Sequence, residues 1–244
     1  MSSSTPLDAP PHILQLLSTL HKKSLDQEAA ISQKEKGKVV SSDILDNLAD
    51  SQTTTPNPQD EFDRLMLDKF IALDADKCQF VYQLLTAMGA TTVIEAGTSF
   101  GVSTIYLALA VGKTAARTGT PGTVIATEKE PSKAAIARGY WAQCGPEVER
   151  VIDLREGDLL VTLLEGVPEV VDVLLLDIWC ALALPTLKTV LPRLRRGAAV
   201  LTDNTISAVE GYRELLAFLR DPGNGFRNVT LPFTGGFEMS VYSP

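Results

Sequence analysis

Carboxylate side chains follow several apolar stretches of the sequence, at positions where ligand-binding groups are often found. Glu95 ends the stretch "VIE" and Glu128 ends "VIATE"; Asp177 ends "VDVLLLD", and the pair Asp203 and Asn204 ends "VLTDN". In an open α/β sheet, ligands bind at the carboxyl ends of the strands. Side chains of this kind face cationic groups, accept hydrogen bonds from sugar hydroxyls or ligate hard metal ions.

The turn after the first stretch, "VIEAGTSFGVST", combines an acid with two glycines. Gly97 and Gly101 leave room for a ligand to approach the backbone closely. Their spacing is G-x-x-x-G, not the G-x-G-x-x-G that cradles a pyrophosphate, which argues against a nicotinamide dehydrogenase. Glu95 disfavours a diphosphate and suits a ligand with a cationic end. A tight turn with a capping acid explains the same residues.

Two further acids lie where a nucleoside could bind. Glu128 follows the turn by about thirty residues, the place from which a carboxylate binds both ribose hydroxyls. Its alternative role is that of an acid stabilised by the dipole of the next helix. Asp158, in "LREGD", can accept a hydrogen bond from the exocyclic amine of adenine or cap a helix predicted over 159–165, and the two roles are compatible.

Asp177 and the pair Asp203 and Asn204 end two apolar stretches that follow one another in the chain. Adjacent strands would bring these three oxygen-bearing side chains together. Two carboxylates and an amide carbonyl, with space for water, suit a hard cation such as Mg²⁺. Asp203 and Asn204 can equally be the start of a loop, because both residue types favour turns.

The elements that must position these residues alternate between β-branched and helical stretches. Strands are predicted over 91–97, 122–128, 151–158, 171–177, 197–204, 226–233 and 236–243. Helices are predicted over 101–113, 131–143, 159–165, 182–194 and 208–220. Five strand–helix units followed by a hairpin predict an α/β sheet with helices on both faces.

The polar N-terminal region is expected to be separate from the main domain. Residues 1–60 are predicted to form a helical or cap segment with a flexible start, and residues 61–244 the main domain. Apolar residues at helical spacing predict a first helix within 10–33. A short helix over 41–50 and a linker follow, and two amphipathic helices are predicted within 61–90.

The composition narrows the class of partner. The chain has 244 residues, 22 basic and 30 acidic, and its net charge of −8 argues against binding nucleic acid or an anionic membrane. No apolar run reaches about 18 residues and the start lacks a secretory signal, so a cytoplasmic protein is expected. Its cysteines lack disulfide or metal spacing, and its histidines lie far from the motifs: Cys78, Cys144, Cys180, His12 and His21.

Taken together, these motifs resemble those of class I S-adenosylmethionine-dependent O-methyltransferases, most of all the metal-dependent catechol and caffeoyl-CoA O-methyltransferases. "VIEAGTSFGVST" looks like their methionine-binding loop, "VIATEKEP" like their ribose-binding strand end and "LREGD" like their adenine segment. "LLLDIWCALALPTL" and "VLTDN" look like their two metal-ligand segments, and all five motifs agree in order and spacing. The resemblance implies an α/β, Rossmann-like, seven-stranded, mostly parallel sheet with helices on both faces, a terminal antiparallel hairpin and additional N-terminal helices.

The resemblance also implies roles for individual residues. S-adenosylmethionine would be bound by Glu95, Gly97, Thr98, Ser99, Gly101, Ser103, Glu128, Asp158 and Asp177. Mg²⁺ would be held by Asp177, Asp203 and Asn204. A small-molecule acceptor would contact Trp179 and Asn204, although core packing explains Trp179 equally well. In related enzymes an N-terminal helical segment covers the substrate side and supports dimer formation, so a homodimer is expected.

One departure from the family bears on the chemistry. Three residues after the first metal aspartate, the catechol enzymes carry a lysine that acts as general base; here that residue is Cys180, and a position often held by histidine is Ile178. No catalytic residue is assigned, because a cysteine among apolar residues has a raised pKa and is usually inert. A carboxylic acid, with a pKa of ~4, needs no base at neutral pH, whereas a phenol, with a pKa of ~10, does.

The sequence therefore predicts methyl transfer to an acceptor that is already ionised, such as a carboxylate. Two alternatives stay open. One is a Mg²⁺-dependent catechol or phenol O-methyltransferase, and the other is a non-catalytic relative that binds the cofactor.

Overall fold

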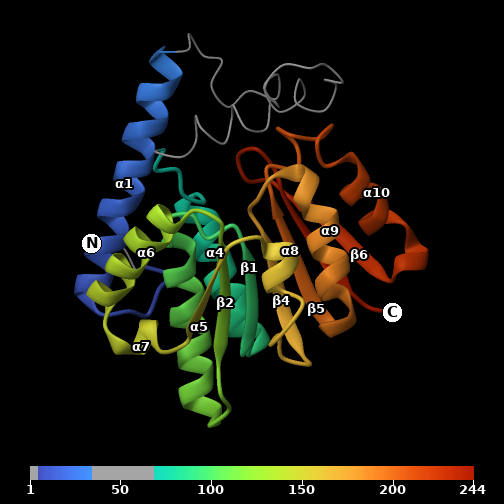
Figure 1. Ribbon diagram of the computed structural model, residues 1–244, viewed down its shortest axis with the longest axis horizontal. Helices are drawn as coiled ribbons and strands as arrows, with labels where there is room; N and C mark the ends of the chain where they lie inside the picture. Colours follow the sequence, from blue (N-terminus) through green and yellow to red (C-terminus); the bar gives the residue numbers. More distant parts are fainter. Residues whose placement is uncertain (1–4, 35–68) are drawn as a thin grey trace.

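A seven-stranded sheet runs through the middle of the molecule (Figure 1). The structure, a computed structural model, describes residues 5–34 and 69–244. The strands are β1 Thr92–Ala96, β2 Thr123–Glu128, β3 Ile152–Glu156, β4 Val171–Leu176, β5 Leu194–Asp203, β6 Phe226–Leu231 and β7 Phe237–Tyr242. They lie in the order β3-β2-β1-β4-β5-β7-β6; the first five are parallel, and β7 is antiparallel to both β5 and β6. The predicted sheet and its terminal hairpin are confirmed.

Helices cover both faces of the sheet (Figure 1). One face carries α1 Pro11–Lys34, α4 Ala75–Met88, α5 Val102–Thr118, α6 Pro131–Cys144 and α7 Pro146–Glu149. The other carries α8 Leu159–Thr162, α9 Cys180–Val190 and α10 Arg213–Arg220. Short 3₁₀ turns, η1 Leu191–Arg193 and η2 Pro222–Asn224, complete the chain.

The central strands are buried on both faces, and most of their residues are apolar. Every residue of β1 and β4 is buried. In β4, Val173 and Leu175 pack into the core beneath α4 and α5, while Leu174 and Leu176 pack into the core beneath α9 and α10. This alternation fixes the register of β4, because a shift by one residue would exchange its two faces.

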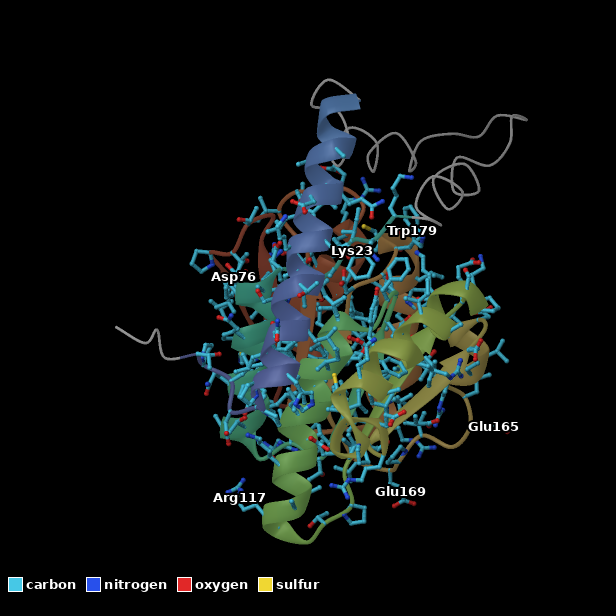
Figure 2. All side chains as sticks on the ribbon, turned by 90° about the vertical axis from the view of Figure 1, so that its left-hand side faces the viewer. Lys23, Asp76, Arg117, Glu165, Glu169 and Trp179 are labelled. Atoms are coloured by element: carbon cyan, nitrogen blue, oxygen red, sulfur yellow. The ribbon has the colours of Figure 1, made fainter. Side chains whose placement is uncertain are left out.

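The carboxyl ends of the parallel strands share one end of the molecule. Glu169, just before β4, and Trp179, just after it, lie at opposite ends of the view in Figure 2. Strands β1, β2, β3 and β5 run parallel to β4 through their shared neighbours, so their carboxyl ends also lie on the Trp179 side.

The N-terminal helix confirms the prediction for residues 10–33. Ile13, Leu17 and Leu20 of α1 are buried in the core that includes α5 and α6. The His21 ring nitrogen lies 2.9 Å from the hydroxyl of Tyr106, which joins α1 to α5. The helix is therefore part of the packed fold. Among the described residues, no helix is long and apolar enough to cross a membrane.

Two predicted helices are shorter than expected. The helix predicted over 159–165 ends at Thr162, because the Arg155 guanidinium donates hydrogen bonds of 2.8 Å to the carbonyls of Thr162, Glu165 and Gly166. The helix predicted over 208–220 begins only at Arg213. The chain before it is held in turns, with backbone amides at 206 and 207 donating to the carbonyl of residue 235.

Some predictions fall outside the described residues. These are the helix over 41–50, the linker after it and the first of the two helices within 61–90; the second of those two is α4. The division between residues 60 and 61 also lies there and stays a prediction.

Candidate active site

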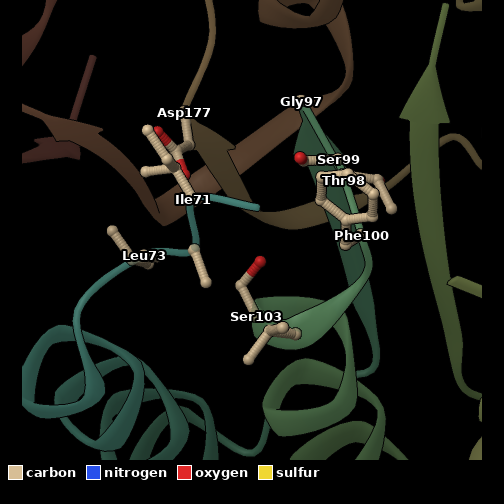
Figure 3. Close-up of a pocket in the computed structure, with 10 residues that line it drawn as sticks. Ile71, Leu73, Gly97, Thr98, Ser99, Phe100, Ser103 and Asp177 are labelled. Atoms are coloured by element: carbon tan, nitrogen blue, oxygen red, sulfur yellow. The ribbon is translucent and has the colours of Figure 1, made fainter. Parts of the chain in front are cut away.

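A pocket opens at the carboxyl end of β1, where several predicted cofactor residues meet (Figure 3). It encloses about 220 Å³, including space open to solvent. Its lining comes from two segments and one strand end: Ile71, Ala72, Leu73, Gly97, Thr98, Ser99, Phe100, Val102, Ser103 and Asp177. Residues 71–73 form one part of its wall, and the loop after β1 forms another.

The segment over the pocket is held in place by α1. The backbone amide of Phe70 donates to Oε1 of Gln27 at 2.8 Å, and the amide of Ala72 donates to Oγ of Ser24 at 2.9 Å. The Phe70 ring stacks on Phe100 of the β1 loop, with ring centroids 4.7 Å apart. The N-terminal helix thus sets the outer wall of the candidate site.

The loop after β1 needs its glycines for close packing as well as for any ligand. Gly97 has a φ of +92°, and a Cβ atom there would lie 2.1 Å from the carbonyl oxygen of Asp177. Gly101 has a φ of +76°, and its carbonyl accepts a hydrogen bond of 3.0 Å from the indole of Trp141. The loop is therefore locked to β4 on one side and to α6 on the other.

Glu95 is fully buried beneath this loop. Its carboxylate accepts hydrogen bonds from the hydroxyls of Thr98 at 2.9 Å, Ser103 at 2.5 Å and Thr104 at 2.5 Å. Burial raises the pKa of Glu95, and these three hydroxyls act in the opposite direction. Glu95 thus stabilises the turn, in line with the alternative that the sequence offered of a tight turn with a capping acid. Its role toward a cationic cofactor group stays a prediction.

Glu128 joins two strand ends. One oxygen accepts the backbone amide of Ser99 at 2.7 Å, and the other accepts the amide of Glu130 at 2.8 Å. Burial raises the pKa of Glu128, and the amide of Glu130 lowers it. A carboxylate has about four lone-pair sites. Two therefore remain for the predicted ribose hydroxyls.

Asp158 caps the short helix α8. Its Oδ1 accepts the backbone amide of Leu160 at 2.9 Å. The capping role proposed from the sequence is confirmed, and binding of the adenine amine stays a prediction. Asp158 and Glu128 do not line the pocket of Figure 3 but lie at the ends of the next two strands.

Asp177 and Asp203 lie at the ends of adjacent strands, as the sequence predicts, with Asn204 beside them. The side-chain amide of Asn204 donates to Oδ2 of Asp203 at 3.1 Å, and Asn204 Oδ1 accepts from Ser207 at 3.3 Å. Asn204 has a φ of +59°, which suits its place at the start of a loop. Burial, together with Asp203 and Glu95, raises the pKa of Asp177 to about 8.

A lysine that the sequence pattern does not single out also lies at this edge. The Nζ of Lys77, in the first turn of α4, lies 2.6 Å from Oδ1 of Asp203 and 2.9 Å from Oδ2 of Asp74. Its side chain is 2% exposed. Burial lowers the pKa of Lys77, but the two carboxylates raise it more, so the group is an ammonium ion. The sequence feature that points to this lysine is its spacing of three residues from Asp74, but such pairs are common at helix starts exposed to solvent.

This ion pair bears on the predicted metal site. In the described part of the chain, no group of three or more His, Cys, Asp or Glu side chains could hold a metal ion. The cation that faces Asp203 is the ammonium of Lys77. The donor set therefore does not fit Mg²⁺ in this arrangement, and the roles of Asp177, Asp203 and Asn204 as ligands stay a prediction.

The positions at which the sequence departs from the catechol enzymes that it resembles lie at the start of α9. Trp179, the predicted acceptor contact, precedes α9 and is partly buried; its role stays a prediction. Cys180 is the first residue of the helix and lies against Gly211, where a Cβ atom would come within 2.9 Å of the sulfur. Tyr212 donates to the carbonyl of Ile178 at 3.2 Å. The space beside Cys180 is thus filled by the turn before α10.

Comparisons with known proteins agree with this arrangement. Residues 94–205 match the model of a methyltransferase domain. The cofactor-bound protein Rv0187 from MTB is 26% identical, with a TM-score of 0.61 over 81% of this chain and 95% of that one. An O-methyltransferase from Bacillus cereus in complex with SAH is 19% identical, with a TM-score of 0.61 over 88% and 97%. The O-methyltransferase TomG from Streptomyces achromogenes, in complex with SAM, is 21% identical, with a TM-score of 0.61 over 82% and 90%. A search of the curated proteins found no match.

Proposed function

We propose that this chain methylates an oxygen atom of a small acceptor that is an anion at neutral pH. The domain match and the fold support a class I S-adenosylmethionine-dependent methyltransferase. A carboxylate, giving a methyl ester, is the acceptor that fits best. The observation that carries this proposal is the start of α9, where the place of the family's basic lysine is taken by Cys180 and closed off by Gly211 and Tyr212.

The cofactor would bind along the ends of β1, β2 and β3. The glycine turn gives the backbone approach, Glu128 has lone pairs left for ribose, and Asp158 has a second oxygen for adenine. The solved neighbours bound to SAH and SAM support this choice of cofactor. When bound, S-adenosylmethionine supplies a methyl group on a sulfonium, ready for in-line displacement.

The chain's own task is then to position the acceptor and to exclude water. Residues 71–73, tied to α1 through the amide of Ala72, form one part of the pocket wall. An ionised acceptor arrives as the nucleophile, so no proton has to be removed. Lys77 is held as an ammonium ion by Asp74 and Asp203, so it cannot act as the missing base.

A Mg²⁺-dependent methyltransferase acting on catechols is the second candidate. The adjacent strand ends that carry Asp177, Asp203 and Asn204 favour it. A metal would activate a neutral phenol without a lysine. Binding would require the Lys77 ammonium to leave Asp203.

An acceptor screen separates these functions. The enzyme would be given S-adenosylmethionine labelled in its methyl group with aryl carboxylic acids in one set and catechols and phenols in another, each with Mg²⁺ or with EDTA. We expect methyl esters in both conditions. Methyl ethers formed only with Mg²⁺ would establish the second candidate instead. Tight binding of S-adenosylhomocysteine by calorimetry without turnover of either set would indicate a non-catalytic cofactor-binding protein.

We also propose that the protein is a cytoplasmic homodimer that binds neither nucleic acid nor membranes. The negative net charge supports the exclusion of nucleic acid and anionic membranes. The dimer rests on the family resemblance and on the packed N-terminal helix α1. Light scattering coupled to size exclusion would give the mass in solution, and a value near twice the 26.3 kDa of the chain is expected.

A further inference from the structure

Several acids gather at the carboxyl ends of β1, β4 and β5. Glu95 lies near the end of β1, Asp177 follows β4 and Asp203 ends β5, and Asp74 approaches from the segment before α4. Buried carboxylates without a partner are costly and become protonated, as the raised pKa of Asp177 indicates, unless a positive charge lies nearby. The described residues supply it from Lys77, whose ammonium contacts both Asp74 and Asp203.

We propose that Lys77 is an internal cation that takes the place of a divalent metal at this edge and keeps the site able to receive an anionic acceptor. The role of Lys77 toward an anionic acceptor rests on the proposed function, whereas its role in place of a metal does not. Lys77 is a positioning residue, because it acts through Asp203 and Asp74 and not on the reacting atoms.

The geometry supports replacement of a metal. A Mg²⁺ or Ca²⁺ ion binds oxygen ligands at 2.0–2.6 Å. Oδ1 of Asp203 already has the Lys77 nitrogen at 2.6 Å, and a second cation on the same oxygen would repel the first. The lysine is also not free to move aside, because its side chain is 2% exposed and its nitrogen is held by Asp74 as well.

The same charge matters for the acceptor. Asp177 and Leu73, the neighbour of Asp74, both line the pocket. Asp203 and Asp74 are not part of the lining but lie next to it in the strand pairing and in the chain, so without the ammonium their negative charges would stand uncompensated behind the pocket wall. An anionic acceptor would be repelled, whereas a neutral one would not, because the effect is one of charge.

Metal binding gives the first test, and it needs no turnover. Mn²⁺ alone would be added to the wild-type protein, to Lys77→Met and to Lys22→Met, with free Mn²⁺ measured by electron paramagnetic resonance. Lys22 pairs with Asp26 on the exposed face of α1, so its variant controls for loss of a lysine charge far from the site. We expect no stoichiometric Mn²⁺ binding by the wild type or by Lys22→Met, and a gained site in Lys77→Met that is lost when Asp203→Asn is added.

Two outcomes would overturn replacement of the metal. One is a stoichiometric Mn²⁺ site in the wild type that Asp203→Asn removes. The other is no Mn²⁺ binding by Lys77→Met, which would mean that these carboxylates never form a cation site. If Lys77→Met does not fold, Lys77→Gln takes its place with the same expectation, because its amide is uncharged and can still donate to Asp203.

Acceptor kinetics give the second test. For the aryl carboxylate turned over best, we expect the KM to rise at least about tenfold in Lys77→Met, with Lys77→Arg restoring most of the loss and the affinity for S-adenosylhomocysteine unchanged. A KM that rises equally for a neutral phenol, or not at all, would overturn the charge role. If no carboxylate is turned over, the proposed function fails, while the Mn²⁺ measurement still decides whether Lys77 replaces a metal.

Discussion

Gly97 is the residue at which the loop after β1 and the end of β4 come closest, so Gly97→Ala tests how the site is built. The new methyl group would lie 2.1 Å from the carbonyl oxygen of Asp177 and 2.6 Å from Cγ2 of Ile178. Real Cβ contacts are not shorter than 3.0 Å, so the Asp177 backbone must retreat by about 0.9 Å or more. The amide of Asp177 resists, because it donates to the carbonyl of Ala96 at 3.0 Å.

The expected cost has two parts. A left-handed conformation costs a residue with a Cβ about 1–2 kcal/mol. Overpacking in a closely packed region adds about 1–3 kcal/mol. The free energy of unfolding should therefore fall by roughly 2–5 kcal/mol. Because the displaced backbone carries Asp177 and borders the pocket, the affinity for S-adenosylhomocysteine should also fall, by about tenfold or more.

Gly119 offers a matched control. It ends α5 with a φ of +70°, and a Cβ atom there would meet nothing within 4 Å. Gly119→Ala should lose only the conformational part, about 1–2 kcal/mol, and should bind S-adenosylhomocysteine normally. Urea denaturation and calorimetry would compare the two variants. If Gly97→Ala lost no more stability than Gly119→Ala and bound as tightly, the argument from close packing would be refuted.

Three further changes test single contacts. Glu128→Gln should weaken binding of S-adenosylhomocysteine about 10-fold or more in calorimetry, because hydrogen bonds to a charged acceptor are lost; unchanged affinity would count against the ribose role. Asp158→Ala should lower the free energy of unfolding in urea by about 1 kcal/mol, and Asp158→Asn, which also caps helices, should lose much less. Burial raises the pKa of the Asp172 carboxyl, but the Arg195 guanidinium and two backbone amides lower it more, so the pKa lies below its usual value. The stability that Asp172 gives the folded protein is therefore present above pH ~4 and is lost as the pH falls through the native pKa. Asp172→Asn should therefore lower the free energy of unfolding near pH 7, and this free energy should fall less steeply below pH ~4 than in the wild type, as measured by urea titrations. An equally steep fall in the variant would contradict this.

Much of the fold follows from patterns that the sequence carries locally. A strand that is buried on both faces shows no alternation of apolar and polar residues. Mainly apolar runs such as 171–176, separated by helical stretches, therefore predict central parallel strands. The acids near their ends were singled out because ligands bind at the carboxyl ends of parallel strands. The same reasoning places Asp177 beside Asp203, once the two strands are adjacent.

The ends of α8 and α10 were not predictable in this way. Helix α8 stops where Arg155, on the preceding strand, donates to the carbonyl of its last residue and to two carbonyls beyond it. The start of α10 is delayed because residues 206 and 207 bond to the β6–β7 hairpin. Both causes are contacts between segments, and the local pattern of apolar residues carries no record of them.

Lys77 shows why the charge of a site is harder to predict than its fold. In the sequence it is one lysine three residues after an acid, a pattern that most helices place in water. Its burial depends on α4 packing so that the side chain reaches Asp203, which ends a strand more than a hundred residues later. A cysteine at position 180 and a lysine at position 77 therefore have different consequences for the chemistry of the site. A lysine at position 180 would correspond to the general base of the related enzymes, whereas Lys77 is kept protonated by two carboxylates. The edge of the sheet around Asp203 thus holds an ammonium ion but offers no general base, which favours an acceptor that needs no deprotonation. Cys180 at the start of α9 and Lys77 therefore both support the proposed anionic acceptor.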